Sequence, residues 1–150
     1  MRLNHAGITV ADMERSLAFY RDSLGLKMYM DVMESGPDAD RAVMETGVLM
    51  RAVCLTDDAG NMVELFEFKS PKARKRPAQH LRYTSTGLVE ISLIVDDMEK
   101  LERDLKKHGF GFKVPPYIWE KEGWKVKLAV ALDPDGVVVE FSQVLGGPQV

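Results

Sequence analysis

Apolar residues alternate with other residues near the N-terminus, and the same alternation returns late in the chain. The apolar positions of the two stretches are Ala6, Ile8 and Val10, and then Ile91, Leu93 and Val95. A period of two is typical of a strand with one buried face. After each stretch the apolar spacing becomes helical, and Asp12 and Asp97 are suitable N-caps. Gly25 and Gly109 are placed to end these predicted helices in a left-handed conformation.

The two stretches belong to an internal repeat. Two blocks match their counterparts without gaps: His5–Glu14 with Glu90–Glu99, and Asp57–Leu65 with Asp133–Phe141. The offset is 85 residues in the first block and 76 in the second. Because the offset falls by nine, the first copy carries additional residues, which we expect to form a loop within 33–47.

Each copy has the pattern of a strand, a helix and three further strands. We therefore predict an α+β fold of two tandem β-α-β-β-β modules, over residues 1–68 and 87–145, with a tail at 146–150. The linker between them, 69–86, contains six Lys or Arg residues and no Asp or Glu. Two interpretations of the linker remain open: a solvated connection, or an arm near a cleft that attracts an anionic substrate.

Four side chains that commonly bind metals occupy equivalent positions of the repeat. His5 and Glu90 begin the first predicted strand of each module, and Glu64 and Glu140 lie in the last strand. By strand alternation, all four project from the face that does not meet the helices. Pairing the two modules would bring together one imidazole and three carboxylates, a set that suits a hard divalent metal. The competing interpretation is that these are ordinary solvated side chains.

Other residues are weaker candidates for substrate contacts. Arg51 and Lys127 are repeat equivalents, and we consider them either a cationic pair facing the cleft or an ordinary exposed pair. Trp119 and Trp124 lie in a segment with Pro115, which we interpret as a loop that forms an aromatic lid or packs at an edge.

Composition and charge argue against a nucleic-acid binder and against a membrane protein. The net charge is −3 and the pI is near 5.6, which disfavours a general nucleic-acid binder. No apolar run approaches the roughly 20 residues that cross a bilayer, and the N-terminus lacks the layout of a signal peptide, so we expect no membrane partner and a cytoplasmic location. The single cysteine, Cys54, cannot form an internal disulfide.

Taken together, these motifs resemble the vicinal oxygen chelate superfamily, which includes glyoxalase I, methylmalonyl-CoA epimerase, extradiol dioxygenases and bleomycin-resistance proteins. The segments that carry the resemblance are Leu3–Asp12, Ser16–Tyr20, Leu24–Leu26, Val63–Leu65 and Asp133–Glu140. The resemblance implies that the modules pair into an open, incompletely closed barrel around a divalent metal, often in a homodimer. It also implies that His5, Glu64, Glu90 and Glu140 are the metal ligands.

One position departs from the family pattern. Glu90 stands where glyoxalase I and the epimerase would have histidine, so three carboxylates would leave the loaded site with a net charge of roughly −1. We therefore expect Mg, Mn, Co or Ni in preference to Zn. An extradiol dioxygenase needs two histidines and one carboxylate for iron, and this sequence offers one histidine.

The reaction that the resemblance implies is a glyoxalase-like lyase, isomerase or epimerase reaction. A base would remove the proton alpha to a carbonyl of a small 2-oxo or acyl-thioester substrate, giving a metal-chelated enediolate. Glu140 is the first candidate for this base and Glu90 the second. We expect the substrate to be anionic, with Arg51 and Lys127 as its anchors. The alternative is a non-catalytic small-molecule binding protein, as bleomycin-resistance proteins are. The sequence leaves open whether the ligands meet within one chain or across two.

Overall fold

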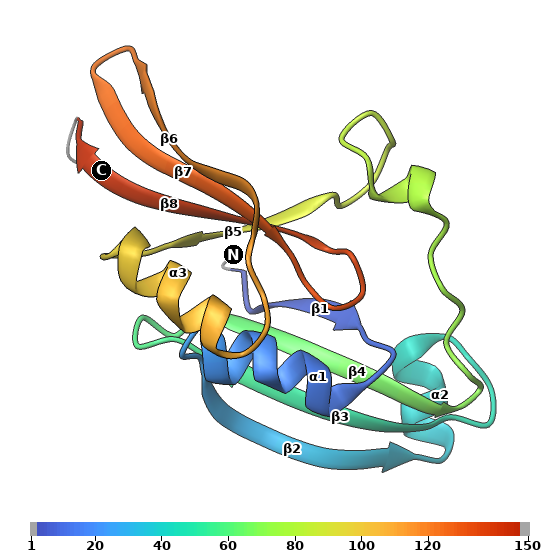
Figure 1. Cartoon of the computed structure of the whole chain (residues 1–150). Coiled ribbons are helices and arrows are strands. Elements are labelled where there is room, and N and C mark those ends of the chain that lie inside the picture. The colour runs from blue at the N-terminus through green and yellow to red at the C-terminus, as the bar shows by residue number, and fades with distance from the viewer. Residues whose placement is uncertain (1–2, 148–150) are drawn as a thin grey trace. The chain divides into compact units, whose positions relative to one another are not determined.

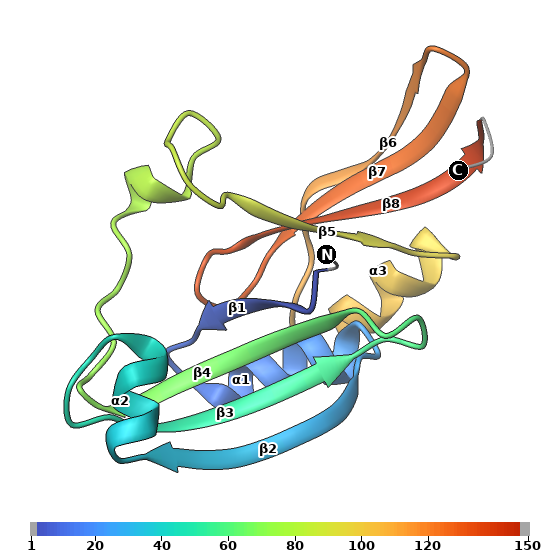
Figure 2. The same ribbon diagram turned by 180° about the vertical axis from the view of Figure 1, so that it is seen from behind.

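The computed structural model describes residues 3–147, without the side chains of residues 78 and 81. Contacts divide the chain into two compact units, Met1–Lys75 and Arg76–Val150, which we call the N-terminal and C-terminal units. Each unit contains one four-stranded mixed sheet, and the sheets have the same strand order (Figures 1 and 2). The predicted α+β fold with a duplicated β-α-β-β-β pattern is confirmed.

The N-terminal sheet has the order β1-β4-β3-β2. Its strands are β1 (His5–Thr9), β2 (Lys27–Ser35), β3 (Leu49–Thr56) and β4 (Met62–Ser70). Strand β1 is parallel to β4, and the other pairs are antiparallel. Helix α1 (Met13–Leu17) continues into a π-helical segment, Ala18–Ser23, and α2 (Pro37–Val43) connects β2 to β3.

The C-terminal sheet has the order β5-β8-β7-β6, in which β5 is parallel to β8. Its strands are β5 (Glu90–Ile94), β6 (Phe112–Lys121), β7 (Trp124–Leu132) and β8 (Val138–Gly146). Helix α3 (Met98–Lys107) follows β5, and a single 3-10 turn, Ala78–Leu81, lies in the basic linker. Among the described residues, no helix is long and apolar enough to span a membrane.

One face of each sheet is apolar and the other carries the predicted ligands. In the N-terminal unit, Val53, Leu55, Val63 and Leu65 are buried on one face, together with Met13 and Leu17 of α1. Glu64 alternates with Val63 and Leu65, so its side chain leaves the opposite face. We call this opposite face, in either unit, the ligand face.

Helices α1 and α3 begin at the predicted N-caps, and the helical stretches that they start end at the predicted glycines. A carboxylate oxygen of Asp12 accepts a hydrogen bond from the backbone N–H of Arg15 at 3.0 Å, and Asp97 accepts one from Lys100 at 2.8 Å. Gly25 and Gly109 have φ angles of +78° and +81°, a region where an L side chain is strained.

Two segments that we predicted as loops are regular structure. Within 33–47, β2 extends to Ser35 and α2 follows, because Pro37 suits the first turn of a helix and Ala39 is buried against the sheet. The segment with Pro115 is part of β6, at an irregularity of its pairing with β7. Prolines are tolerated there because β6 is an edge strand, so one side of its backbone needs no partner.

Candidate metal centre

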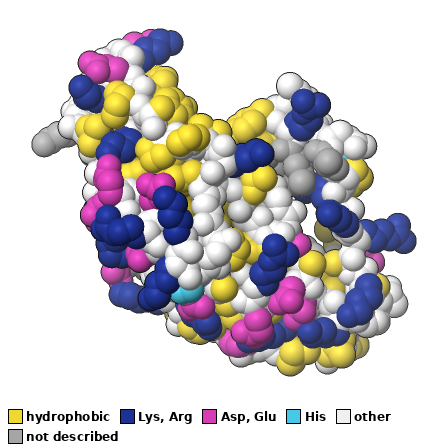
Figure 3. Space-filling model, in the orientation of Figure 1, with side chains coloured by type: hydrophobic (Ala, Val, Ile, Leu, Met, Phe, Trp, Pro, Cys, Tyr) yellow, Lys and Arg dark blue, Asp and Glu magenta, His cyan; other side chains and the backbone are white. Residues whose placement is uncertain are grey.

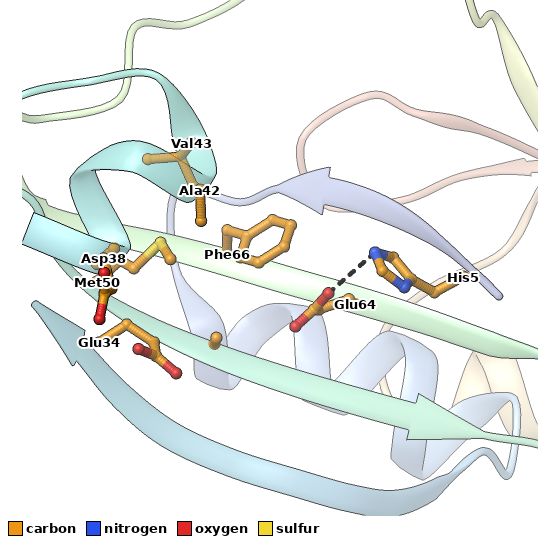
Figure 4. A pocket seen from close by; sticks show the side chains of 10 residues that line it. His5, Glu34, Asp38, Ala42, Val43, Met50, Glu64 and Phe66 are labelled. Carbon is orange, nitrogen blue, oxygen red and sulfur yellow. Dashed lines mark ion pairs between the residues drawn. The ribbon is translucent and has the colours of Figure 1, made fainter.

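His5 and Glu64 lie side by side on the ligand face of the N-terminal sheet (Figure 4). Strand β1 pairs with β4 so that Gly7 is the partner of Glu64, and His5 is two residues before Gly7 on the same face. Nε2 of His5 is 3.2 Å from Oε2 of Glu64. The two strands thus bring one nitrogen and one oxygen donor together.

The orientation of the His5 ring favours cation binding at Nε2. Nδ1 of His5 is 2.7 Å from Oδ1 of Asn4, and since an amide oxygen only accepts, Nδ1 carries the proton. The lone pair of Nε2 in the neutral ring then faces the carboxylate of Glu64, and the two repel each other unless a proton or a metal ion lies between them. Metal-binding histidines usually donate the hydrogen of their other ring nitrogen to a neighbouring oxygen in this way.

The C-terminal unit repeats this strand register with two carboxylates. Ser92 of β5 is the partner of Glu140 on β8, so Glu90 stands to Glu140 as His5 stands to Glu64. Oγ of Ser92 donates a hydrogen bond to Oε1 of Glu140 at 3.0 Å. The hydroxyl of Tyr83 donates to Oε2 of Glu90.

Tyr83 is a neighbour of the candidate site that the sequence did not single out. Burial raises the pKa of Tyr83 to about 12, and the hydrogen bond to Glu90 and the charges of Glu90 and Glu140 act in the same direction. The phenol therefore stays protonated at neutral pH and serves as a donor to Glu90. No sequence pattern pointed to it, because it lies in the irregular linker.

Each unit supplies a pair of candidate ligands. Within either unit, the described residues include no group of three or more His, Cys, Asp or Glu side chains able to hold a metal ion. The donor set is chemically suitable for a hard divalent ion, since it offers carboxylate oxygens and one correctly oriented imidazole. By donor chemistry the residues of the two pairs fit the metal that the resemblance implies, and metal binding itself stays a prediction.

Arg51 and Lys127 lie on the face opposite the ligands. Nη1 of Arg51 is 2.5 Å from Oε1 of Glu14 on α1, and Nζ of Lys127 is 2.6 Å from Oε1 of Glu99 on α3. Glu14 and Glu99 are themselves repeat equivalents, so the two ion pairs are the same contact in both units. The prediction that these cations face the ligand cleft is not supported, because strand alternation turns them to the helix side.

These ion pairs also change the acidity of the partners. Arg51 forms two hydrogen bonds with Asp31, from Nε at 2.9 Å and from Nη2 at 2.7 Å. They hold the pKa of Asp31 below its usual range. The hydrogen bond from Lys127 likewise lowers the pKa of Glu99. Arg51 and Lys127 thus connect helix and sheet.

Trp119 and Trp124 lie in the β6–β7 hairpin instead of a loop. Trp119 pairs with Val126, which is four residues along β7 from Val130, the partner of Glu140. Four residues of strand span roughly 13 Å, and Trp124 lies two residues further along β7, so the indoles share the face of Glu140 without lying next to it.

A pocket of about 420 Å³ opens on the ligand face of the N-terminal unit (Figure 4). It is lined by His5, Glu34, Asp38, Ala39, Ala42, Val43, Met50, Ala52, Glu64 and Phe66. The lining contains acidic and apolar side chains and one histidine, and no Lys or Arg among the described residues. On the molecular face drawn in Figure 3, basic and acidic side chains are interspersed.

Comparison with solved structures shows the fold. A glyoxalase family protein from Bacillus cereus superposes with a TM-score of 0.82 at 18% identity, covering 97% of this chain and 95% of that one. A glyoxalase family protein from Enterococcus faecalis gives 0.66 at 19% identity, with 94% and 96% covered. Glyoxalase I from Zea mays gives 0.66 at 22% identity, with 95% of this chain and 44% of that one covered.

Sequence comparison shows the family. No curated protein sequence matches the chain significantly. The sequence profile of the Glyoxalase/Bleomycin resistance protein/Dioxygenase superfamily matches residues 2–141, nearly the whole chain. The chain therefore belongs to the Glyoxalase/Bleomycin resistance protein/Dioxygenase superfamily.

Proposed function

We propose that this chain is a glyoxalase-like, divalent-metal-dependent lyase, isomerase or epimerase. It would remove the proton alpha to a carbonyl of a small 2-oxo or acyl-thioester substrate. The observation that carries the proposal is the identical strand register of the two candidate pairs, His5 with Glu64 and Glu90 with Glu140. The register places both side chains of each pair on one face of neighbouring strands, the arrangement that lets two side chains bind one ion.

The donor atoms of each candidate side chain determine the role that we propose for it. His5, Glu64 and Glu140 would hold the ion, and Glu90 would be either a fourth ligand or a nearby carboxylate oriented by Tyr83. A bound divalent ion would polarise the substrate carbonyl and stabilise the negative charge that develops on its oxygen. Mg, Mn, Co and Ni suit three carboxylates better than Zn does.

Glu140 is our first candidate for the base. Ser92 and Ser142 both contact its Oε1, at 3.0 Å and 3.5 Å, and this leaves Oε2 to alternate between holding the ion and taking the proton. Glu90 is the second candidate, with Oε1 as the accepting atom because Tyr83 occupies Oε2. A carboxylate with one oxygen held by a hydroxyl is oriented for transfer through the other.

An anionic substrate is not part of this proposal. That expectation depended on the basic linker and on Arg51 and Lys127, and these two cations pair with Glu14 and Glu99 on the opposite face. Homodimerisation, which is common in the superfamily, remains a proposal for this chain.

Two measurements test the proposed function. We expect chelator-free protein to contain a divalent metal, and His5→Ala and Glu140→Gln to lose it. Glu67→Gln is the matched control, because Glu67 follows Glu64 on β4 but lies on the other face. We also expect metal-dependent exchange of a substrate alpha proton with solvent deuterium, across a panel of 2-oxo hemithioacetals and acyl-thioesters. Metal content that is low in the wild type and equal in all variants would contradict the proposal.

The second candidate function is sequestration of a small molecule without chemistry. The acidic and apolar pocket of the N-terminal unit favours it, because such a pocket can bind a ligand in the absence of a metal. Tight binding of a panel compound with no proton exchange would support this function over the enzyme.

A further inference from the structure

The pocket of the N-terminal unit follows a line of residues across all four strands of the sheet. Strand register places His5 on β1, Glu64 and Phe66 on β4, Ala52 and Met50 on β3, and Glu34 on β2 on one face. Glu34 is the direct cross-strand partner of Met50. The line therefore begins at the candidate metal pair, crosses an apolar floor and ends at a carboxylate.

Helix α2 makes this end of the sheet different from its counterpart. It occupies the insertion that the second module lacks, and Asp38, Ala39, Ala42 and Val43 on it line the pocket. The helix is anchored, because the carboxylate of Asp40 accepts hydrogen bonds from the N–H groups of Gly47 at 3.0 Å and Val48 at 2.7 Å. The pocket wall is thus built before a ligand arrives.

The floor also depends on a glycine. A Cβ on Gly7 would lie 2.9 Å from Cε2 of Phe66, so the missing side chain leaves room for the ring. The equivalent position in the C-terminal unit is Ser92, whose hydroxyl donates a hydrogen bond to Glu140. Phe66 packs with Val43 against the cluster of Ala39, Val48 and Met50.

The charges at the far end of the pocket are negative and largely uncompensated. Among the described residues, Asp38 forms one ion pair, in which its Oδ1 is 3.5 Å from Nη1 of Arg41, and both side chains are more than four-fifths exposed. Within the described part of the chain, Glu34 forms no ion pair. An anionic ligand would be repelled here, and a cationic group would be attracted.

We propose that this pocket binds the non-reacting part of the ligand, and that this part is an aliphatic body ending in an ammonium group near Glu34. The inference rests on the proposed function, because the reacting end would lie at His5 and Glu64. Three strand spacings separate β1 from β2, so a ligand that joins both ends spans roughly 14 Å. Helix α2 then determines substrate specificity.

Hexylammonium, hexanol and hexanoate serve as probes of the pocket. The full chain, labelled with ¹³C in the methionine methyl groups, is titrated with each probe after chelator treatment and again with metal. We expect the Met50 methyl signal to shift, with hexylammonium binding more tightly than hexanol and hexanoate most weakly. Glu34→Gln should weaken hexylammonium binding about threefold to fivefold, the range of a partly exposed ion pair. Glu45→Gln, which removes an exposed charge just after α2 outside the pocket lining, should leave it unchanged.

Blocking the pocket provides a second variant. Ala42→Trp places an indole on the pocket side of α2 and should abolish the Met50 shift for hexylammonium and hexanol, while the other methionine signals report the fold. Equal affinities for hexylammonium and hexanoate, or an unchanged affinity in Glu34→Gln, would overturn the inference. If the protein binds no metal but still binds hexylammonium more tightly than hexanoate, the proposed function is contradicted and this inference stands.

Discussion

Three of the four predicted ligands have a polar neighbour in their own unit that holds one atom in place. Asn4 holds Nδ1 of His5, Tyr83 holds Oε2 of Glu90, and Ser92 holds Oε1 of Glu140. Such partners orient a ligand and leave its other donor atom for the ion. The four ligands could be read from the repeat, but their neighbours could not. Asn4 and Tyr83 lie outside the predicted strands, and their contacts depend on the folded chain.

Asn4 gives a direct test of this orientation. Asn4→Ala removes the acceptor that keeps the proton on Nδ1 of His5, so more of the ring will carry its proton on the metal-facing nitrogen. We expect metal affinity to fall about tenfold, the lower end of the range for such partners. Competition with a chromogenic chelator measures it. Asn4→Asp, which keeps an acceptor, should retain most of the affinity, and equal affinity of Asn4→Ala and the wild type would contradict the assigned role.

The Asp31–Arg51 pair predicts a pH dependence of stability. The pKa of Asp31 is lowered in the folded state from its usual 3.8, so the pair stabilises the fold above that pH. The stabilisation is lost as the pH falls through the lowered folded-state value. Because the Asp31 side chain is 36% exposed, Asp31→Asn should cost only about 1 kcal/mol at pH 7. Urea unfolding over a pH series measures this difference, which should vanish in strong acid.

Asp58→Asn is the control for this series. Asp58 pairs with Lys27, but its side chain is 85% exposed, so its loss should change the free energy of unfolding much less. A difference between Asp31→Asn and the wild type that persisted unchanged into strong acid would show that the carboxylate acts through something other than its charge.

The elements of the two units agree wherever the repeat constrained them and differ where it did not. Asp12 and Asp97 cap equivalent helices because both lie in the matched blocks. Helix α2 has no repeat partner, and the turn-like residues before it concealed that Pro37 begins a helix. In β6, Pro115 is a turn signal in a single sequence, but an edge strand accommodates it. Local signals therefore failed where tertiary position decided the outcome.

The carboxylate of Asp40 joins helix α2 to the two residues just before β3. Asp40→Ala leaves the N–H groups of Gly47 and Val48 without that acceptor, and Val48 is buried. We expect a loss of about 2 kcal/mol in the free energy of unfolding and faster amide exchange in α2. Asp38→Ala, on the same helix but with a side chain 96% exposed, should change stability by less than about 0.5 kcal/mol. Equal stabilities of the two variants would contradict this anchoring.

Over the whole molecule, duplication accounts for most of what the sequence could predict. Strand parity and the two offsets were sufficient to place His5 with Glu64, and Glu90 with Glu140, on equivalent neighbouring strands. Strand parity was also available for Arg51 and Lys127, which are separated by an even number of residues from the buried helix-side residues of β3 and β7. Their ion pairs with Glu14 and Glu99 could have been anticipated from the same offsets. The pocket could not, since it depends on α2.

The duplication leads to a prediction about stoichiometry. Neither unit's described residues contain three candidate ligands, and two donors hold a divalent ion weakly. If the two pairs share an ion, the wild type binds a single metal ion per chain. His5→Ala and Glu140→Gln, although in different units, then each lose nearly all of it. The double variant should be no worse than either single one, because an interaction that is already lost cannot be lost again. Metal analysis after gel filtration, with Glu67→Gln as the control, measures the ratio. Two ions per chain in the wild type and one in each single variant would show instead that each unit binds its own metal.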